Sequence, residues 1–140
     1  MNTNKLLLGA LAGGVTYFLL GYILYGNLLA GFFASNAGTA QGAAKAPEEM
    51  VMWALVVGNL VNGLLLAVIY ERWANIRTFA TGAKAGAVIG LLMALAFDLI
   101  MFGTSNVMTL TASLVDPLVY AVISAVAGGV VGWALGYKRA

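Results

Sequence analysis

The chain has 140 residues, of which 62% are hydrophobic and 9% are charged, with a formal net charge of +2. Soluble domains have about 45 to 50% apolar and about 25% charged residues, so this composition predicts an integral membrane protein. The absence of Cys and His excludes disulfides, thiolate nucleophiles and imidazole bases, and we expect neither a metal nor a cofactor. The small, dispersed positive charge argues against nucleic-acid binding.

Four runs are long and apolar enough to cross a bilayer, because a spanning helix needs about 20 mostly apolar residues. They are residues 5–26, 47–73, 81–103 and 117–137. We therefore predict an all-α integral membrane protein with a single domain over residues 1–140, a bundle of four transmembrane helices. The first run is too long for a signal-peptide core of about 7 to 15 apolar residues, so we expect it to remain as a span.

The second and fourth runs begin with signals of a helix start. The motif "APEEM" places Pro47 at the first helical position and two glutamates in the first turn, where the helix dipole favours negative charge. The motif "VDPLVY" has the same form, so Asp116 is predicted to be the N-cap of the fourth helix, with Pro117 as its first residue. Both motifs account for these acids without a function.

The basic residues predict how the chain is oriented. Six of the seven Lys and Arg residues fall on one side of the membrane if the N-terminus is inside, and only Lys45 falls on the other. The positive-inside rule then places both termini in the cytoplasm. The six residues are Lys5, Arg72, Arg77, Lys84, Lys138 and Arg139.

Small residues recur every four positions along the predicted spans. Such ridges let helix backbones approach closely in lipid, where the hydrophobic effect does not drive helix association. We predict that the ridges of the third and fourth helices pack antiparallel as a glycine zipper and that the first helix joins them in the cytoplasmic half, although the same rows could join two protomers. The predicted packing residues are Gly9, Gly13, Gly82, Gly86, Gly90, Gly128, Gly132 and Gly136.

Asp98 lies within the apolar stretch "GLLMALAFDLIMFG". A charged side chain at the bilayer centre costs at least about 2.5 to 3.5 kcal/mol, so Asp98 needs a partner, water or a task. Two interpretations are open: a hydrogen-bonded carboxyl group that joins the third helix to the fourth, or an outward-facing polar pocket in which Asp98 binds a cation or exchanges a proton. The candidate partners or ligands are Asn59, Asn62, Tyr120 and Ser124.

These observations lead to two functional hypotheses from different classes. The first is binding or translocation of a small solute or ion through the pocket, in a homodimer, because four short helices rarely enclose a full path alone. The second is an accessory or scaffold subunit in which Asp98 is a structural hydrogen-bond lock. We expect no enzyme activity, because one buried acid without His, Cys or a carboxylate cluster is poorly suited to acid–base chemistry.

The stretch "YFLLGYILYGNLLAGFF" and the last helix resemble a known family. The residues that carry the likeness are Phe18, Gly21, Tyr22, Tyr25, Gly26, Leu28, Gly31 and Phe32, with Gly128, Gly132 and Trp133 in the last helix. This pattern is similar to that of the bacterial membrane proteins of domain of unknown function 1761, although Leu24 stands where they usually have Trp. The resemblance implies a four-helix bundle in the bacterial cytoplasmic membrane, without an assigned activity or catalytic residues.

Overall fold

The structure is a computed structural model that describes residues 2–137, a range that contains helices and loops but no β-strand. The elements are α1 (Thr3–Ile23), η1 (Leu24–Leu28), α2 (Ala30–Ser35), η2 (Pro47–Glu49), α3 (Met52–Val68), η3 (Ile69–Ala74), α4 (Phe79–Thr104) and α5 (Leu110–Gly136). The turns η1 and η3 are π-helical and extend α1 and α3, whereas η2 is one 3₁₀ turn.

Four helical segments within residues 2–137 are long and apolar enough to cross a membrane. They are Thr3–Leu28, Met52–Ala74, Phe79–Thr104 and Leu110–Gly136. This finding confirms the prediction of an all-helical chain with four candidate spans. Two residues used in the orientation prediction, Lys138 and Arg139, lie outside the described residues.

The prediction that Asp116 caps the last helix is wrong. Helix α5 begins at Leu110, and its N-cap is Thr109, whose side chain accepts a hydrogen bond of 3.2 Å from the backbone N–H of Ala112. Asp116 and Pro117 therefore lie inside α5. The physical reason is that backbone polar groups in lipid must be bonded within the segment, so the apolar residues before Asp116 continue the helix back to Thr109.

The second membrane helix also starts later than its sequence motif predicts. Pro47 opens the separate turn η2, in which the Glu49 side chain accepts a hydrogen bond of 3.2 Å from the backbone N–H of Ala46. Met50 and Val51 are extended, and α3 begins at the next residue. The glutamates therefore stabilise a turn in the loop and lie outside the first turn of the spanning helix.

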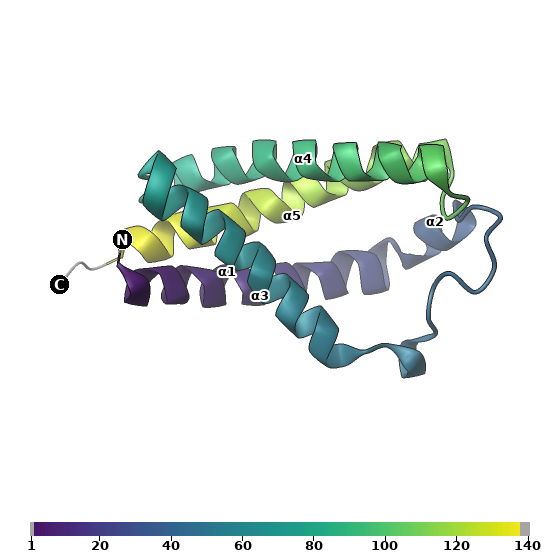
Figure 1. Cartoon of the computed structure of the whole chain (residues 1–140), viewed down its shortest axis with the longest axis horizontal. Helices are drawn as coiled ribbons and strands as arrows, with labels where there is room; N and C mark the ends of the chain where they lie inside the picture. The colour runs from purple at the N-terminus through teal and green to yellow at the C-terminus, as the bar shows by residue number, and fades with distance from the viewer. Residues whose placement is uncertain (1, 138–140) are drawn as a thin grey trace.

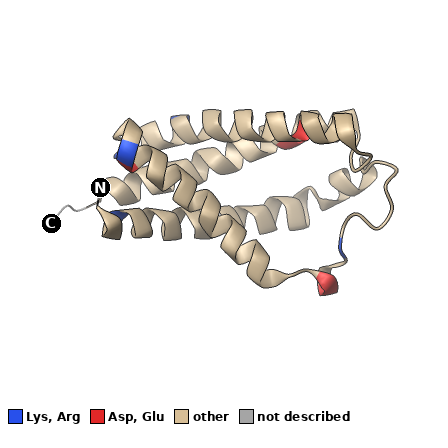
Figure 2. Cartoon of the chain, viewed as in Figure 1, with Lys and Arg blue, Asp and Glu red and all other residues tan. Residues whose placement is uncertain are grey.

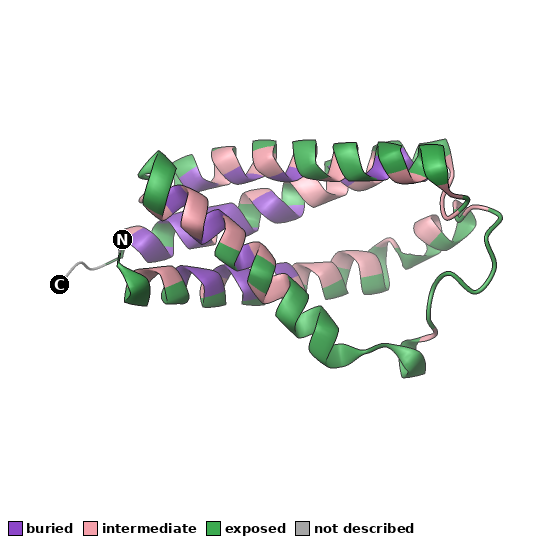
Figure 3. Cartoon of the chain, in the orientation of Figure 1, coloured by how far each residue is buried: buried purple, intermediate pink, exposed green. Residues whose placement is uncertain are grey.

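Helix α5 is the central helix of the bundle. It packs along α4 on one side and along α1 on the other, and α1 also packs along α3 (Figure 1). Among residues 2–137, α5 therefore has more buried residues than any other helix, whereas residues 51–58, at the start of α3, diverge from the bundle and are exposed (Figure 3). The core residues are Tyr17, Leu66, Ala67, Tyr70, Ile123, Ala127, Val131 and Leu135.

The bundle has two distinct ends (Figure 1). At the end where Asn2 and Tyr137 lie, called here the terminal end, Glu71 forms an ion pair of 3.0 Å with Arg77. At the opposite end, called the loop end, the connection after α1 is bonded to the turn between α4 and α5. There the backbone N–H of Gly38 donates to the carbonyl of Val107 at 3.1 Å.

The backbones of α4 and α5 are in direct contact at several small residues. A Cβ atom added to Gly82 would collide with the carbonyl oxygen of Gly128, and one added to Gly86 would collide with the carbonyl oxygen of Ser124. At Gly90 an added Cβ would overlap the Ser124 side chain. Larger residues at these positions would force the two helices apart, which is why small residues favour close helix packing in lipid. Other predicted packing glycines also lie against neighbouring elements, namely Gly9, Gly13, Gly132 and Gly136.

Candidate functional site

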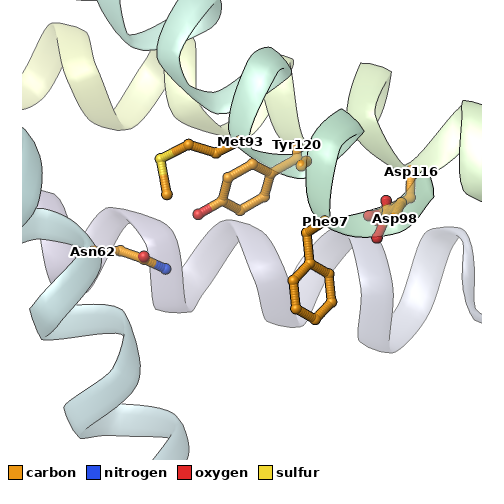
Figure 4. Close-up of a pocket in the computed structure, with 7 residues that line it drawn as sticks. Asn62, Met93, Phe97, Asp98, Asp116 and Tyr120 are labelled. Carbon is orange, nitrogen blue, oxygen red and sulfur yellow. The ribbon is translucent and has the colours of Figure 1, made fainter. Parts of the chain in front are cut away.

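A pocket of about 460 Å³ lies where α3, α4 and α5 face one another in the half of the bundle toward the loop end (Figure 4). Its volume falls within the range of about 300 to 1,000 Å³ that is usual for small-molecule sites. Most of its wall is apolar, and its charged groups are two carboxyls. The lining residues are Asn62 from α3, Met93, Ala94, Phe97 and Asp98 from α4, and Asp116 and Tyr120 from α5.

The carboxyl groups of Asp98 and Asp116 lie side by side at one end of the pocket and are called here the acid pair (Figure 4). The two helices run in opposite directions, and each acid is six residues from the helix end that borders the α4–α5 turn. At 1.5 Å per residue, both acids are about 9 Å inside the spans. The antiparallel register of α4 and α5 therefore brings together two acids that are 18 positions apart in the sequence.

The two acids differ in their partners. Asp116 Oδ1 accepts a hydrogen bond of 2.5 Å from the hydroxyl of Tyr25, which lies in η1 at the end of the first span. Asp98 is only 4% exposed, and its buried Oδ2 atom has no hydrogen-bond partner among residues 2–137 other than the neighbouring Asp116 carboxyl. A buried, unsatisfied carboxylate oxygen is costly, so this atom is the feature of the pocket that most requires a bound proton or ligand.

No Lys or Arg residue in the described part of the chain lines the pocket. The described basic residues lie toward the terminal end or in the long connection, away from the acid pair (Figure 2). Two adjacent carboxylates in a membrane repel each other and also lose their hydration. The pair must therefore hold a proton or attract a cation.

A second polar cluster lies next to the pocket. The Tyr17 hydroxyl donates a hydrogen bond of 2.9 Å to Ser124 Oγ, and the rings of Tyr17 and Tyr120 stack with centroids 5.7 Å apart. Tyr17 and Ser124 are both buried. This cluster joins α1 to α5 and supports the Tyr120 ring, which itself lines the pocket.

Some of the residues predicted from the sequence reach the pocket, and others do not. Asp98, Asn62 and Tyr120 line it. Ser124 is not a lining residue, because its hydroxyl is directed to Tyr17. Asn59 is not a lining residue either, and its side-chain amide donates to the carbonyl of Leu55 in its own helix at 2.7 Å.

Sequence reasoning missed Asp116 as a member of the site, together with Tyr25 and the apolar wall. A signal for Asp116 was present, because it stands four residues before Tyr120, and residues four apart share one helix face. The spacing placed both residues on one ridge of the fourth helix, but the apparent helix-start motif around Pro117 led to the interpretation of Asp116 as a cap. No comparable signal in the sequence identifies Tyr25 as its hydrogen-bond donor.

The fold and the pocket define a small helical protein that carries an acid pair within two of its four candidate membrane spans. Comparisons of the chain with protein-family models, curated proteins and solved structures find no match. The resemblance to domain of unknown function 1761 therefore stays a prediction.

Proposed function

We propose that the protein binds or translocates a small solute or ion through this pocket, with the acid pair as its charge-sensitive group. The observation that carries the proposal is the Asp98 carboxyl group, which lines a pocket and lies beside the carboxyl of Asp116. Its buried Oδ2 atom has no hydrogen-bond partner among residues 2–137 other than that second acid. An intramembrane acid without a counter-charge is typical of ion pathways and proton relays. No enzymatic step is part of the proposal.

The proposed setting is a bacterial cytoplasmic membrane with both termini in the cytoplasm. The distribution of basic residues supports this orientation, because Arg72 and Arg77 belong to the terminal end, whereas Lys45 lies in the long connection toward the loop end. The pocket then lies in the outer half of the membrane and faces outward. The small-residue contacts of α4 and α5 serve as a glycine zipper in the inner half and keep it closed.

A homodimer completes the proposed path, because one set of four short helices encloses little more than the pocket itself. The exposed start of α3, residues 51–58, is available for such contact. The lipid bilayer and a second copy are thus the partners in this proposal.

The test measures transport and ligand binding by the Asp98→Asn variant in proteoliposomes. Asparagine nearly preserves the size and hydrogen-bonding capacity of Asp98 but carries no charge and does not titrate. We expect proton or cation flux to fall to the level of empty liposomes. The matched control is Glu48→Gln, which removes an exposed acid from η2, outside the spans. Unchanged flux in Asp98→Asn would disprove the role of the acid pair.

The second candidate function is a scaffold or accessory subunit in which the same acids only join helices. The bond from Tyr25 to Asp116 favours this alternative, because it connects the first span to α5. A scaffold role predicts that Asp98→Asn changes thermal stability but neither flux nor ligand binding. The same variant therefore separates the two functions.

A further inference from the structure

We infer that the pocket takes an amphipathic organic monocation, which enters from the lipid side between α3 and α4 and displaces one proton from the acid pair. This inference rests on the proposed binding function and names its substrate class.

The two ends of the pocket differ in chemistry (Figure 4). Asp98 and Asp116 lie together at one end, whereas Asn62 lies at the opposite end, and the Tyr120 hydroxyl points toward that side. The wall between these groups is formed by Met93 and Phe97. A ligand that matches this order carries one positive charge, which is attracted to the acids, and an apolar body, which contacts Met93 and Phe97.

A bare metal ion matches the pocket poorly. Calcium and magnesium ions take six or more oxygen ligands, and no three Asp, Glu, His or Cys side chains of residues 2–137 come together to hold a metal. An inorganic ion at the acid pair would also leave the apolar wall unused. An organic cation uses both features, because Phe97 and Tyr120 supply aromatic rings that attract cations.

Charge balance sets the exchange at one proton for each cation. In the empty pocket the proposed state of Asp98 is the protonated carboxyl group, because its burial in a membrane disfavours an added charge. When a monocation binds, one O–H bond breaks, its electron pair stays on the carboxylate, and the proton leaves to water. The net charge of the site is unchanged, because one cation takes the place of the one proton that leaves Asp98.

The groups that line the pocket or bond to the acid pair, called here the facing groups, support this balance. From α5 they are Asp116 and Tyr120, and from η1 the group is Tyr25. Helix α3 contributes Asn62, which is uncharged. The facing groups therefore include no permanent cation that would compete with the ligand.

The pocket is accessible through apolar side chains. Phe97 is 63% exposed and Met93 is 46% exposed, although both line the pocket, so they stand at its rim. The start of α3 diverges from the bundle on the same side (Figure 1). An amphipathic cation that is already dissolved in the outer leaflet can thus reach the acids without crossing water.

The experiment uses the full-length protein in nanodiscs, with tetraphenylphosphonium as probe and tetraphenylborate as its shape-matched anion. We expect tetraphenylphosphonium to bind and to release about one proton per cation in weakly buffered solution near neutral pH, because the cation takes the place of the Asp98 proton. Lower pH weakens the binding, because protons compete for the same carboxylates. Tetraphenylborate is assayed without the cation, because the two ions pair with each other in solution, and it is expected to show no binding that depends on Asp98.

Two variants test the two parts of the contact with the cation, namely the acid and the aromatic rim. Asp98→Asn is expected to weaken tetraphenylphosphonium binding by about 30-fold or more and to abolish proton release. Phe97→Ala removes an aromatic ring from the rim and is expected to weaken binding by about 3-fold to 30-fold with proton release per bound cation unchanged. The matched control is Phe102→Ala, an exposed aromatic of the same helix that does not line the pocket.

Each outcome decides the inference. If Asp98→Asn does not fold, the comparison of Phe97→Ala with Phe102→Ala still tests it, and equal affinities of these two variants overturn it. Asp98-dependent binding of tetraphenylborate, or cation binding without proton release, also overturns it. If tetraphenylphosphonium fails to bind while Asp98-dependent flux of protons or inorganic cations persists, the substrate class is wrong but the proposed function stands.

Discussion

The contact between α4 and α5 can be tested with a single methyl group at Gly86. The added Cβ would collide with the backbone carbonyl of Ser124, and a backbone atom cannot move aside as a flexible side chain can. Overpacking of this kind costs about 1 to 3 kcal/mol. A gap of about 0.5 to 1 Å between the helices would also forfeit a quarter to a half of the dispersion energy of the atoms that line it. Gly86→Ala should therefore destabilise the fold.

The matched control is Gly58→Ala in α3, where an added Cβ would have no neighbour within 4 Å. Alanine is favoured over glycine in a helix by about 1 kcal/mol, so this variant should be as stable as the original or more so. The assay is thermal or denaturant unfolding of both variants in the same detergent, followed by helical circular dichroism. If Gly86→Ala proves as stable as Gly58→Ala, the backbones of α4 and α5 are not in contact at this position.

Three further predictions concern the site, the loop end and the orientation. Tyr25→Phe removes the hydroxyl that donates to Asp116 Oδ1. The unsatisfied oxygen should lower the free energy of unfolding by about 1 to 3 kcal/mol, measured by thermal denaturation. No loss of stability would disprove that hydrogen bond. Gly38→Ala would drive a Cβ into the carbonyl of Asn106, so it should speed proteolysis of the connection after α1. Gly31→Ala should not, because its added Cβ has no neighbour within 4 Å. Reporters fused to either terminus should be active only in the cytoplasm; periplasmic activity at either end would contradict the positive-inside prediction.

The sequence predicted the existence of the spans better than their starts. Hydrophobic length identified four spans because a bilayer requires about 20 apolar residues whatever the helix packs against. Local start motifs were less reliable. The motif at Pro47 forms a loop turn, and the motif at Pro117 lies inside α5, because a lipid-embedded backbone continues as helix wherever apolar residues allow it.

The candidate site was predicted in part. Asp98 stood out because an acid in an apolar run is rare, and Asn62 and Tyr120 were named with it as candidate polar groups. Asn59 was placed in the same group, but its amide bonds to its own helix. Whether the Asn59 side chain reaches the pocket depends on the rotation of its helix and on local competition for hydrogen bonds. A rule based on residue spacing describes neither.

The sequence by itself determined that the chain is apolar, helical and divided into four candidate spans, because these properties depend on composition and segment length. Only the tertiary structure decided that α5 is central, that Asp116 meets Asp98, and that Tyr25 bonds to Asp116. The reason is that these contacts join residues far apart in the chain. They depend on the rotation and register of packed helices, which the packing of every neighbouring side chain sets together.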